Sequence, residues 1–254
     1  MVRIFLVSHM KHAPASQYHL KDRQEFYDKT FKTKDIQDHP SNYRSILKIL
    51  EILRYAQDDH FKFLDISCGS GRLLQEIKDL TLKTFGGDFS KTALDLAKAR
   101  CPKTNFILFN GEKLPFKNDT FYMATNCGSL EHYEHPQMGI SEMSRVLKKG
   151  GKALIIVPNS FQWRHIVEVF WRGGLKDSWQ TYDLHLTKSD WIKLIQENGL
   201  KVLKTYKFED VPELIQWNKG QIKLKSFKKF LRDLLAKYLF PLNFTKQFMF
   251  LCAK

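Results

Sequence analysis

The sequence predicts an α/β fold built around a mostly parallel sheet. From Phe61 onward, short apolar runs alternate with segments of helical period, which is typical of consecutive βαβ units. The 254 residues are 43% apolar and 27% charged, a globular composition that excludes a disordered or collagen-like chain. The longest uncharged apolar runs, such as Ala153–Pro158, are far shorter than the roughly 20 residues of a membrane-spanning helix.

The individual elements follow from where the hydrophobic period changes between two and 3.6 residues. We expect strands at Lys62–Ile66, Lys83–Gly87, Asn105–Phe109, Thr120–Thr125, Lys152–Val157, Leu200–Phe208 and Gln247–Ala253. We expect helices at Gly71–Leu80, Lys91–Arg100, Pro136–Leu147 and Ser189–Asn198. Lysines 148 and 149 followed by two glycines predict that the third of these helices stops there.

The chain divides into three parts of one globular unit. Residues 1–60 are expected to form an N-terminal extension, polar to about His39 and then helical from Ser41 to Tyr55. Residues 61–158 form the core of alternating strands and helices, and residues 159–254 complete the sheet. The last part carries two insertions: a lid-like aromatic segment at 159–187 and a basic segment at 210–245.

Charge and cysteine content suggest where the protein works. Forty-one basic and 27 acidic residues leave a net charge of +14, which calls for an anionic partner or surface. No C-x-x-C pair or zinc spacing occurs among the four cysteines, so free thiols in a reducing cytoplasm are expected. The apolar run Ile4–Val7 is shorter than a signal-peptide core, and we therefore expect a cytoplasmic protein.

Residues 219–238 contribute seven basic side chains against one acidic one. Large apolar residues there recur at three- and four-residue steps, which predicts one apolar helix face: Phe227, Phe230, Leu231, Leu234, Leu235 and Tyr238. Such a helix, within 221–240, could rest on an anionic membrane surface. Alternatively, its apolar face covers the sheet and its lysines face solvent.

The sharpest local signal is the run from Phe61 to Arg72, an expected strand that leads through Gly69-x-Gly71 into an expected helix. Glycines at such a turn let the chain bend tightly and let a ligand approach without meeting a Cβ atom. Asp88 lies 19 residues beyond Gly69, at the end of the second expected strand, where a carboxylate can bind both ribose hydroxyls. Asp88 could instead be a surface or helix-capping residue.

The Gly-x-Gly turn lacks the residues that bind phosphate groups, and this limits the type of nucleoside ligand. A dinucleotide site needs a third glycine for close helix packing around a pyrophosphate, and here Arg72-Leu73-Leu74 stands in its place. No Gly-Lys-Ser/Thr follows, which excludes a P-loop. A ligand with ribose and adenine but without phosphate fits better.

Five ordered motifs between about Phe61 and Asn159 resemble the class I S-adenosylmethionine-dependent methyltransferases, particularly the broad quinone, sterol and natural-product group. They are Leu64–Gly71, Gly87–Ser90, Leu114–Phe116 followed by Asp119–Phe121, Leu130–His132, and Arg145–Gly151. The resemblance implies a Rossmann-like sheet of seven strands, with helices on both faces and the last strand antiparallel. It also implies S-adenosyl-L-methionine as the cofactor and methyl transfer as the reaction.

The resemblance further implies roles for particular residues. Asp65, Ser67, Gly69 and Gly71 would surround the methionine part of the cofactor, whose carboxylate would lie near the helix N-terminus, assisted by Arg72. Asp88 would hold the ribose and Phe89 would pack on the nucleoside. The remaining contacts would be Asn110 and Gly111 at the adenine and Cys127 to Leu130 near the sulfonium. No metal is expected, because the spacing of His132, Glu134 and His135 matches no zinc enzyme.

Three residues depart from the usual pattern of this family. Ser67 stands in place of a glycine, Asn110 in place of a common aspartate, and Tyr122 in place of a frequent aspartate. The amide oxygen of Asn110 can still accept a hydrogen bond from the adenine amino group. These departures bear on how tightly the cofactor binds, and they leave open a cofactor-binding protein without turnover.

A general base is needed only if the methyl acceptor must lose a proton. His132, expected just beyond the fourth strand at the carboxyl edge of the sheet, is the candidate catalytic residue; otherwise it is a structural histidine bonded to a loop. His185 and Tyr182 are weaker candidates. We expect a small-molecule or lipid-like acceptor bound under the aromatic insertion, with an RNA methyltransferase or a non-catalytic regulatory protein as alternatives.

Overall fold

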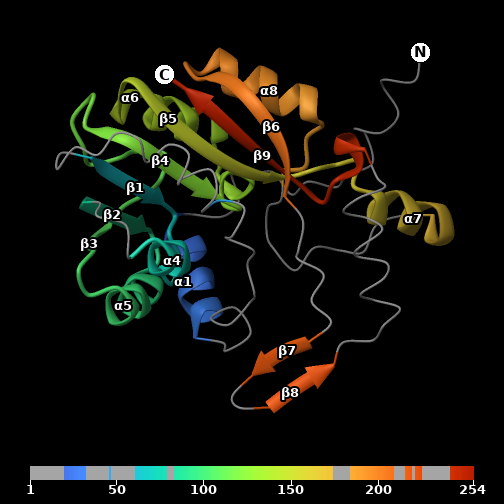
Figure 1. Cartoon of the computed structure of the whole chain (residues 1–254), viewed down its shortest axis with the longest axis horizontal. Helices are drawn as coiled ribbons and strands as arrows, with labels where there is room; N and C mark the ends of the chain where they lie inside the picture. Colours follow the sequence, from blue (N-terminus) through green and yellow to red (C-terminus); the bar gives the residue numbers. More distant parts are fainter. Residues whose placement is uncertain are drawn as a thin grey trace.

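A computed structural model describes residues 20–32, 46, 61–78, 83–173, 184–208, 215–218, 221–224 and 241–254. Seven strands form one sheet in the order β3-β2-β1-β4-β5-β9-β6 (Figure 1). Their bounds are β1 Lys62–Ile66, β2 Lys83–Asp88, β3 Asn105–Leu108, β4 Phe121–Cys127, β5 Leu147–Pro158, β6 Lys201–Phe208 and β9 Gln247–Ala253. β9 runs antiparallel to both β5 and β6, and the other neighbours are parallel, which confirms the predicted Rossmann-like topology.

Helices cover both faces of this sheet. α6 (Pro136–Val146) and α8 (Lys188–Glu197) lie on one face, and α4 (Arg72–Glu76) and α5 (Lys91–Arg100) on the other (Figure 1). Side chains of β5 alternate between the two layers: Ile155 packs with α6 and α8, whereas Leu154 and Ile156 pack with α4 and α5. This alternation is the period of two that a strand buried on both faces requires.

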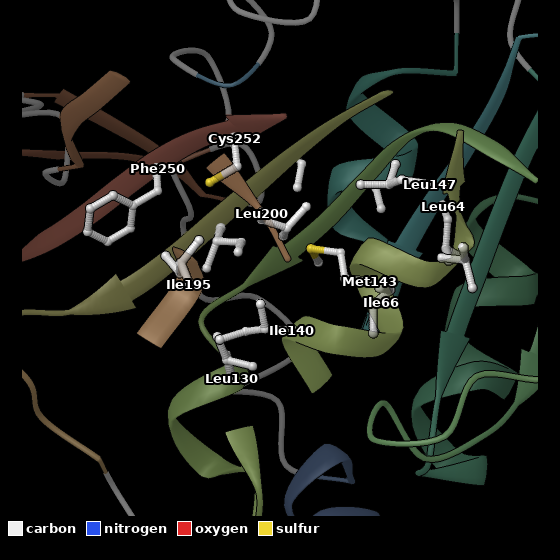
Figure 2. Packing of buried hydrophobic residues seen from close by; sticks show 14 of the residues in the cluster. Leu64, Ile66, Leu130, Ile140, Met143, Leu147, Ile195, Leu200, Phe250 and Cys252 are labelled. Carbon is white, nitrogen blue, oxygen red and sulfur yellow. The ribbon is translucent and has the colours of Figure 1, made fainter. Parts of the chain in front are cut away.

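The larger core lies between the sheet and the helix pair α6 and α8. Figure 2 shows Leu64 and Ile66 of β1 and Phe250 and Cys252 of β9 in the same layer as Ile140, Met143 and Ile195 from the two helices. Ile140 and Met143 lie three residues apart on α6, and the sequence therefore presents both to the sheet. The core thus spans the sheet from β1 to β9 and holds the ends of the central strands rigidly.

The order of the strands reverses between β1 and β4. Chain connections leave these two strands in opposite directions, and open α/β sheets bind ligands in a crevice at the carboxyl ends of such strands. The Gly-x-Gly turn follows β1 directly, and the short 3-10 helix η2 (Leu130–His132) follows β4. The fold therefore brings the two segments that carry the sequence motifs to one edge.

The N-terminal extension holds an element that the sequence did not indicate. α1 (Leu20–Phe31) lies in the stretch expected to be polar, and it packs beside α5 (Figure 1). Its sequence contains few apolar residues, so it produces little helical period. The expected helix Ser41–Tyr55 falls outside the described residues except for Ile46, which is fully buried.

The third helix ends within one residue of its prediction, but the predicted start of the fifth strand, Lys152, was wrong. α6 ends at Val146, and Leu147 already pairs with Phe121 as the first residue of β5. The strand continues through Gly150, whose φ of 78° suits glycine, and its pairing register with β4 shifts between Phe121 and Met123. The two lysines and two glycines therefore form an irregular strand start and not a helix cap.

Both insertions contain regular structure. The lid-like segment 159–187 includes helix α7 (Trp163–Arg172), and residues 174–183 lie outside the described part of the chain. The basic segment 210–245 includes the strand pair β7 (Ile215–Asn218) and β8 (Gln221–Leu224) and the short helix η3 (Leu242–Phe244). The start of the expected basic stretch 221–240 is therefore a strand, and its expected helical residues, 227–238, are not described. Within the described residues, no helix is both long and apolar enough to cross a bilayer.

Candidate functional site: a nucleoside crevice between β1 and β4

The Gly-x-Gly turn has the backbone geometry that its sequence requires. Ser67, Gly69 and Gly71 have φ values of 56°, 52° and 74°, all in the left-handed region. The Cys68 N–H donates to the Gly87 carbonyl of β2 at 2.9 Å, which fixes the turn against the neighbouring strand. A Cβ atom on Gly71 would lie 3.0 Å from the Cβ of Ala97, so this glycine lets α4 and α5 approach each other.

Two buried carboxyl groups flank the turn. Asp88 accepts hydrogen bonds from the N–H groups of Gly69 and Ser90, both at 2.9 Å. Burial raises its pKa to about 6, although these hydrogen bonds oppose the rise. Asp65 accepts a hydrogen bond of 2.6 Å from the Thr125 hydroxyl of β4, and burial raises its pKa to about 7.

The serine at position 67 is accommodated by a buried hydrogen-bond network. Its hydroxyl lies 2.8 Å from the Tyr133 hydroxyl, which also accepts from the Asn126 amide at 2.9 Å. Asn126 in turn accepts from the Leu130 N–H at 3.0 Å, so the network joins the segments that follow β1 and β4. The Ser67 side chain is therefore bound to the protein, and the departure from glycine has a structural partner in Tyr133.

Glycines make room for this tyrosine. A Cβ atom on Gly111 would lie 1.9 Å from the Tyr133 hydroxyl, and one on Gly139 would lie 2.6 Å from its ring. Burial raises the pKa of the Tyr133 hydroxyl, which thus stays protonated. Sequence reasoning missed Tyr133, because a tyrosine after a strand carries no signal of its own unless the small residues opposite it are recognised.

Helix α1 crosses the open side of the nucleoside crevice. Its Asp28 accepts hydrogen bonds from the Ser90 hydroxyl and, at 3.0 Å, from the Thr92 N–H, and its Gln24 amide donates to the Phe89 carbonyl at 2.7 Å. The Tyr27 ring lies 5.1 Å from the ring of Phe89 in an edge-on arrangement. Phe31 of α1 also lies beside Gly69: a Cβ atom there would come within 3.3 Å of its ring.

His132 ends η2 at the carboxyl end of β4, as its sequence position predicts. Its side chain is 13% exposed, and its Nε2 lies 3.8 Å from a carboxylate oxygen of Glu131. Arg23 of α1 donates to the His132 carbonyl, and the ring of Tyr27 lies 6.5 Å away. The imidazole is thus held beside the crevice next to an acidic group.

A second group of polar side chains lies near η2. The Leu184 N–H donates to the Glu131 carbonyl at 2.9 Å, which brings the segment of His185 to this edge. The His185 ring lies 5.3 Å from that of His165 in α7, and Gln162 is hydrogen-bonded to His165 at 2.6 Å. Tyr182, the other weak base candidate, lies outside the described residues.

The remaining predicted residues gather at the same edge of the sheet. Asn110 follows β3, and its side-chain oxygen accepts from the Glu112 N–H at 3.0 Å. Cys127 ends β4, and burial, with the charges of Asp65 and Glu131, raises the pKa of its thiol well above the ordinary value. This shift favours the neutral thiol. No cluster of three metal-binding side chains occurs in the described residues.

The electrostatics of the crevice suit a zwitterionic nucleoside. Arg72 follows the Gly-x-Gly turn, and its buried Nη1 has no hydrogen-bond partner among the described residues, as expected for a group that binds a carboxylate. Two buried carboxyl groups, Asp65 of β1 and Asp88 of β2, lie at the ends of these adjacent strands. The fold and the site therefore define a class of proteins that bind an adenosine carrying an amino acid.

Comparison with known proteins agrees with this class. Residues 64–155 match the family model of a methyltransferase domain. An uncharacterised protein of Methanocaldococcus jannaschii is 29% identical over 206 residues, which cover 78% of this chain and 77% of that protein. Demethylmenaquinone methyltransferase of Paenarthrobacter aurescens is 31% identical, with 44% of this chain and 42% of the relative covered. The 2-methyl-6-phytyl-1,4-hydroquinone methyltransferase of Spinacia oleracea is 33% identical, with 45% and 31% covered.

Solved structures share the fold over more of the chain. An S-adenosylmethionine-dependent methyltransferase of Thermotoga maritima has a TM-score of 0.59 and 15% identity, covering 91% of this chain and 97% of that one. The [4+2]-cyclase SpnF has a TM-score of 0.59 and 16% identity, covering 92% and 95%. Geranyl diphosphate C-methyltransferase of Streptomyces coelicolor, solved with S-adenosyl-L-homocysteine, has a TM-score of 0.52 and 13% identity, covering 81% and 79%.

Residues 64–155 form a methyltransferase domain, and the chain has the fold of solved S-adenosylmethionine-dependent methyltransferases. Its cofactor is S-adenosyl-L-methionine, and its enzyme class is methyltransferase. The stretch it shares with the two quinone-type methyltransferases is less than half of their length, so these relatives do not by themselves identify its methyl acceptor.

Proposed function

We propose that this enzyme transfers the methyl group of S-adenosyl-L-methionine to a small, quinone-like or otherwise lipid-like acceptor. The observation that carries the proposal is the pair of buried carboxyl groups, Asp65 and Asp88, at adjacent strand ends beside the left-handed turn. The acceptor class is supported by the relatives named for demethylmenaquinone and for 2-methyl-6-phytyl-1,4-hydroquinone.

The proposed cofactor contacts are those that the sequence motifs imply. Asp88 would accept the ribose hydroxyls, because each carboxylate oxygen that holds a backbone N–H can accept a second hydrogen bond. Phe89 would pack on the nucleoside, Asn110 and Gly111 would face the adenine, and Cys127 would line the floor. The methionine part would lie among Asp65, Ser67, Gly69 and Gly71, with its carboxylate near Arg72.

In this mechanism the protein mainly positions the reactants. When bound, the cofactor supplies an electrophilic methyl group on a positively charged sulfur, and that charge disappears on transfer. The crevice therefore needs to exclude water and align the acceptor in line with the leaving sulfur, without stabilising a new ion. α1 contacts both the segment after β2 and η2, and we propose that it helps to exclude water there.

We propose that His132 acts as the general base for a phenolic acceptor. Methylation of a hydroquinone is accelerated when its hydroxyl loses a proton, and a neutral imidazole can take that proton near neutral pH. Glu131, 3.8 Å from Nε2, would stabilise the imidazolium that results.

Label transfer tests the reaction. The purified protein is incubated with reduced quinones or cell extract and a cofactor carrying an isotopically labelled methyl group, and products are identified by mass spectrometry. We expect label in a quinol, a loss of about 10²–10⁴-fold in turnover for His132→Ala, and unchanged cofactor affinity. His135→Ala is the matched control, since that side chain is half exposed and lies beyond η2. Full activity of His132→Ala would exclude the base assignment.

The net charge of +14 supports a second candidate, methylation of RNA. In the same experiment, label that ribonuclease treatment releases from the extract would favour that reading over the quinone. Cofactor binding without any labelled product would favour a regulatory protein. The fold alone does not determine the reaction, since a [4+2]-cyclase shares it.

We also propose that the protein is cytoplasmic and that the basic stretch 221–240 contacts the surface of an anionic membrane. Its support is the charge of residues 219–238 and their apolar period. Vesicle binding that survives Phe230→Asp would remove this stretch from consideration.

A further inference from the structure

Helix α7 carries the largest exposed apolar side chains in the described part of the molecule. Phe170 is 79% exposed and Trp171 is 76% exposed, and Ile166, Val167 and Val169 are each more than 40% exposed. Exposed apolar residues are ordinary when they are scattered, but a contiguous group on one element marks a contact surface.

The helix is amphipathic, with a wide apolar side and a narrower polar side. With 3.6 residues per turn, positions 163, 166, 167 and 170 share one side, 169 and 171 flank them, and the polar positions 164, 165, 168 and 172 occupy the remaining arc. The apolar arc covers more than half of the helix. In Figure 1, α7 lies beyond the ends of β5 and β9, apart from the helices that cover the sheet.

Neighbouring residues extend this surface. Asn159, at the end of β5, donates to the carbonyls of Asn243 and Thr245, both at 2.8 Å, and accepts from the Phe161 N–H at 3.0 Å. Phe161 and Phe244, which are 49% and 37% exposed, are thereby held at the base of α7. Lys246 lies there too, since its carbonyl accepts from the Asn159 N–H at 3.2 Å.

We propose that α7, with Phe161 and Phe244, is a membrane-contact surface that rests on an anionic lipid bilayer. An amphipathic helix with aromatic residues on its apolar face lies in the headgroup region of a membrane, and positive charge draws such a protein to anionic lipid. The chain supplies that charge, +14 in total. The residues of this surface lie outside the basic stretch 221–240 in the sequence.

The position of α7 near the catalytic edge suggests a role for membrane contact in delivering the acceptor. The helix starts directly beyond β5, and its His165 stacks near His185, whose segment is bonded to Glu131 in η2. An acceptor dissolved in the bilayer would thus reach the catalytic edge without crossing water. The delivery of the acceptor rests on the proposed function, whereas the binding of α7 to a membrane does not.

Flotation with lipid vesicles tests the proposal on the full chain. We expect wild type to float with vesicles of mixed phosphatidylcholine and phosphatidylglycerol, and to do so weakly with phosphatidylcholine alone. The double variant Phe170→Glu/Trp171→Glu is expected to lose at least tenfold in vesicle affinity. Met138→Glu on α6, where the native side chain is 48% exposed, is the matched control and is expected to bind as wild type.

A second variant reports on insertion itself. Trp171→Phe keeps the apolar face, so it is expected to bind vesicles normally while losing the share of tryptophan quenching by lipids with brominated chains that comes from position 171. Equal vesicle binding by wild type and the double variant, or no binding by wild type, would overturn the proposal. A wild-type dimer that the double variant converts to a monomer in light scattering would instead assign this face to a second copy. Cofactor affinity, measured by calorimetry on each variant, is expected to be unchanged, so loss of vesicle binding stays separable from failure of the methyltransferase site.

Discussion

Asp65 combines deep burial with a single side-chain hydrogen bond, from Thr125. Burial raises the pKa of this carboxyl to about 7, whereas an aspartate in an unfolded chain has a pKa of about 4. Between these values the folded protein holds a proton that the unfolded chain has released. The contribution of Asp65 to folding stability therefore falls as pH rises from about 4 to about 7.

Replacing Asp65 by Asn tests this assignment in the cofactor-free protein. The asparagine oxygen can still accept from Thr125 and carries no charge to bury. Relative to wild type, the variant is expected to gain about 1–4 kcal/mol of unfolding free energy between pH 5 and pH 8, measured by urea unfolding at both values. Asp95→Asn on α5, whose side chain is exposed, is the control and is expected to show no such gain. A constant difference at the two pH values would contradict a raised pKa.

The Tyr133 hydroxyl joins Ser67 to Asn126 inside the protein. Tyr133→Phe leaves the buried Asn126 and the partly buried Ser67 without this hydrogen bond, so a loss of about 1–3 kcal/mol in unfolding free energy is expected. Adding Ser67→Gly removes one of the orphaned groups and relieves a positive φ, and the double variant is expected to recover part of the loss. Tyr206→Phe serves as the control in the same urea titration. Strictly additive effects of the two changes would show that Ser67 and Tyr133 are not coupled.

Among the secondary-structure elements, α1 is attached to the segment after β2 through hydrogen bonds of its side chains. The pKa of Asp28 is lowered: burial works to raise it, but the hydrogen bonds from Ser90 and Thr92 outweigh burial. Those bonds anchor α1 over the loop that leads from β2 to α5. These hydrogen bonds are not part of the hydrophobic core. We therefore expect them to hold α1 over the site more than to stabilise the whole fold.

Asp28→Ala is therefore expected to weaken cofactor affinity about 5- to 100-fold, the effect of losing about 1–3 kcal/mol of charge-assisted hydrogen bonds. The melting temperature without cofactor is expected to change little. Glu25→Ala on the same helix, where the native side chain is 77% exposed, is the matched control. Calorimetric titration with S-adenosyl-L-homocysteine measures both variants, and wild-type affinity in Asp28→Ala would mean that α1 does not close the site.

These elements also indicate how far sequence reasoning reaches. The strands of the core were predicted within two residues where apolar runs are bounded by turn residues, as for Lys62–Ile66 and Gln247–Ala253. α1 was missed because it packs through a few side chains on a polar background, and the start of β5 was missed because lysines and glycines also end helices. Tyr133 was missed because its role depends on Gly111 and Gly139, which lie 22 residues before it and six after it in the chain.

For the whole molecule, β9 is an interior strand of the sheet, next to the edge strand β6. β9 lies between β5 and β6, and its residues alternate between the two core layers: Phe248, Phe250 and Cys252 face α6 and α8, whereas Met249 faces the other side. Stability and the geometry of the catalytic edge thus depend on a segment far in sequence from the motifs.

Phe250→Ala tests this dependence. Phe250 is fully buried and pairs with Ile155 of β5 and Thr205 of β6, and removing its ring leaves a cavity that the flanking strands cannot close. We expect a loss of about 3–5 kcal/mol, a large share of the 5–15 kcal/mol that holds a typical domain folded. Leu203→Ala in β6, where the side chain is 47% exposed, is expected to cost far less. Urea unfolding measures both, and similar losses in the two variants would show that β9 does not carry the core.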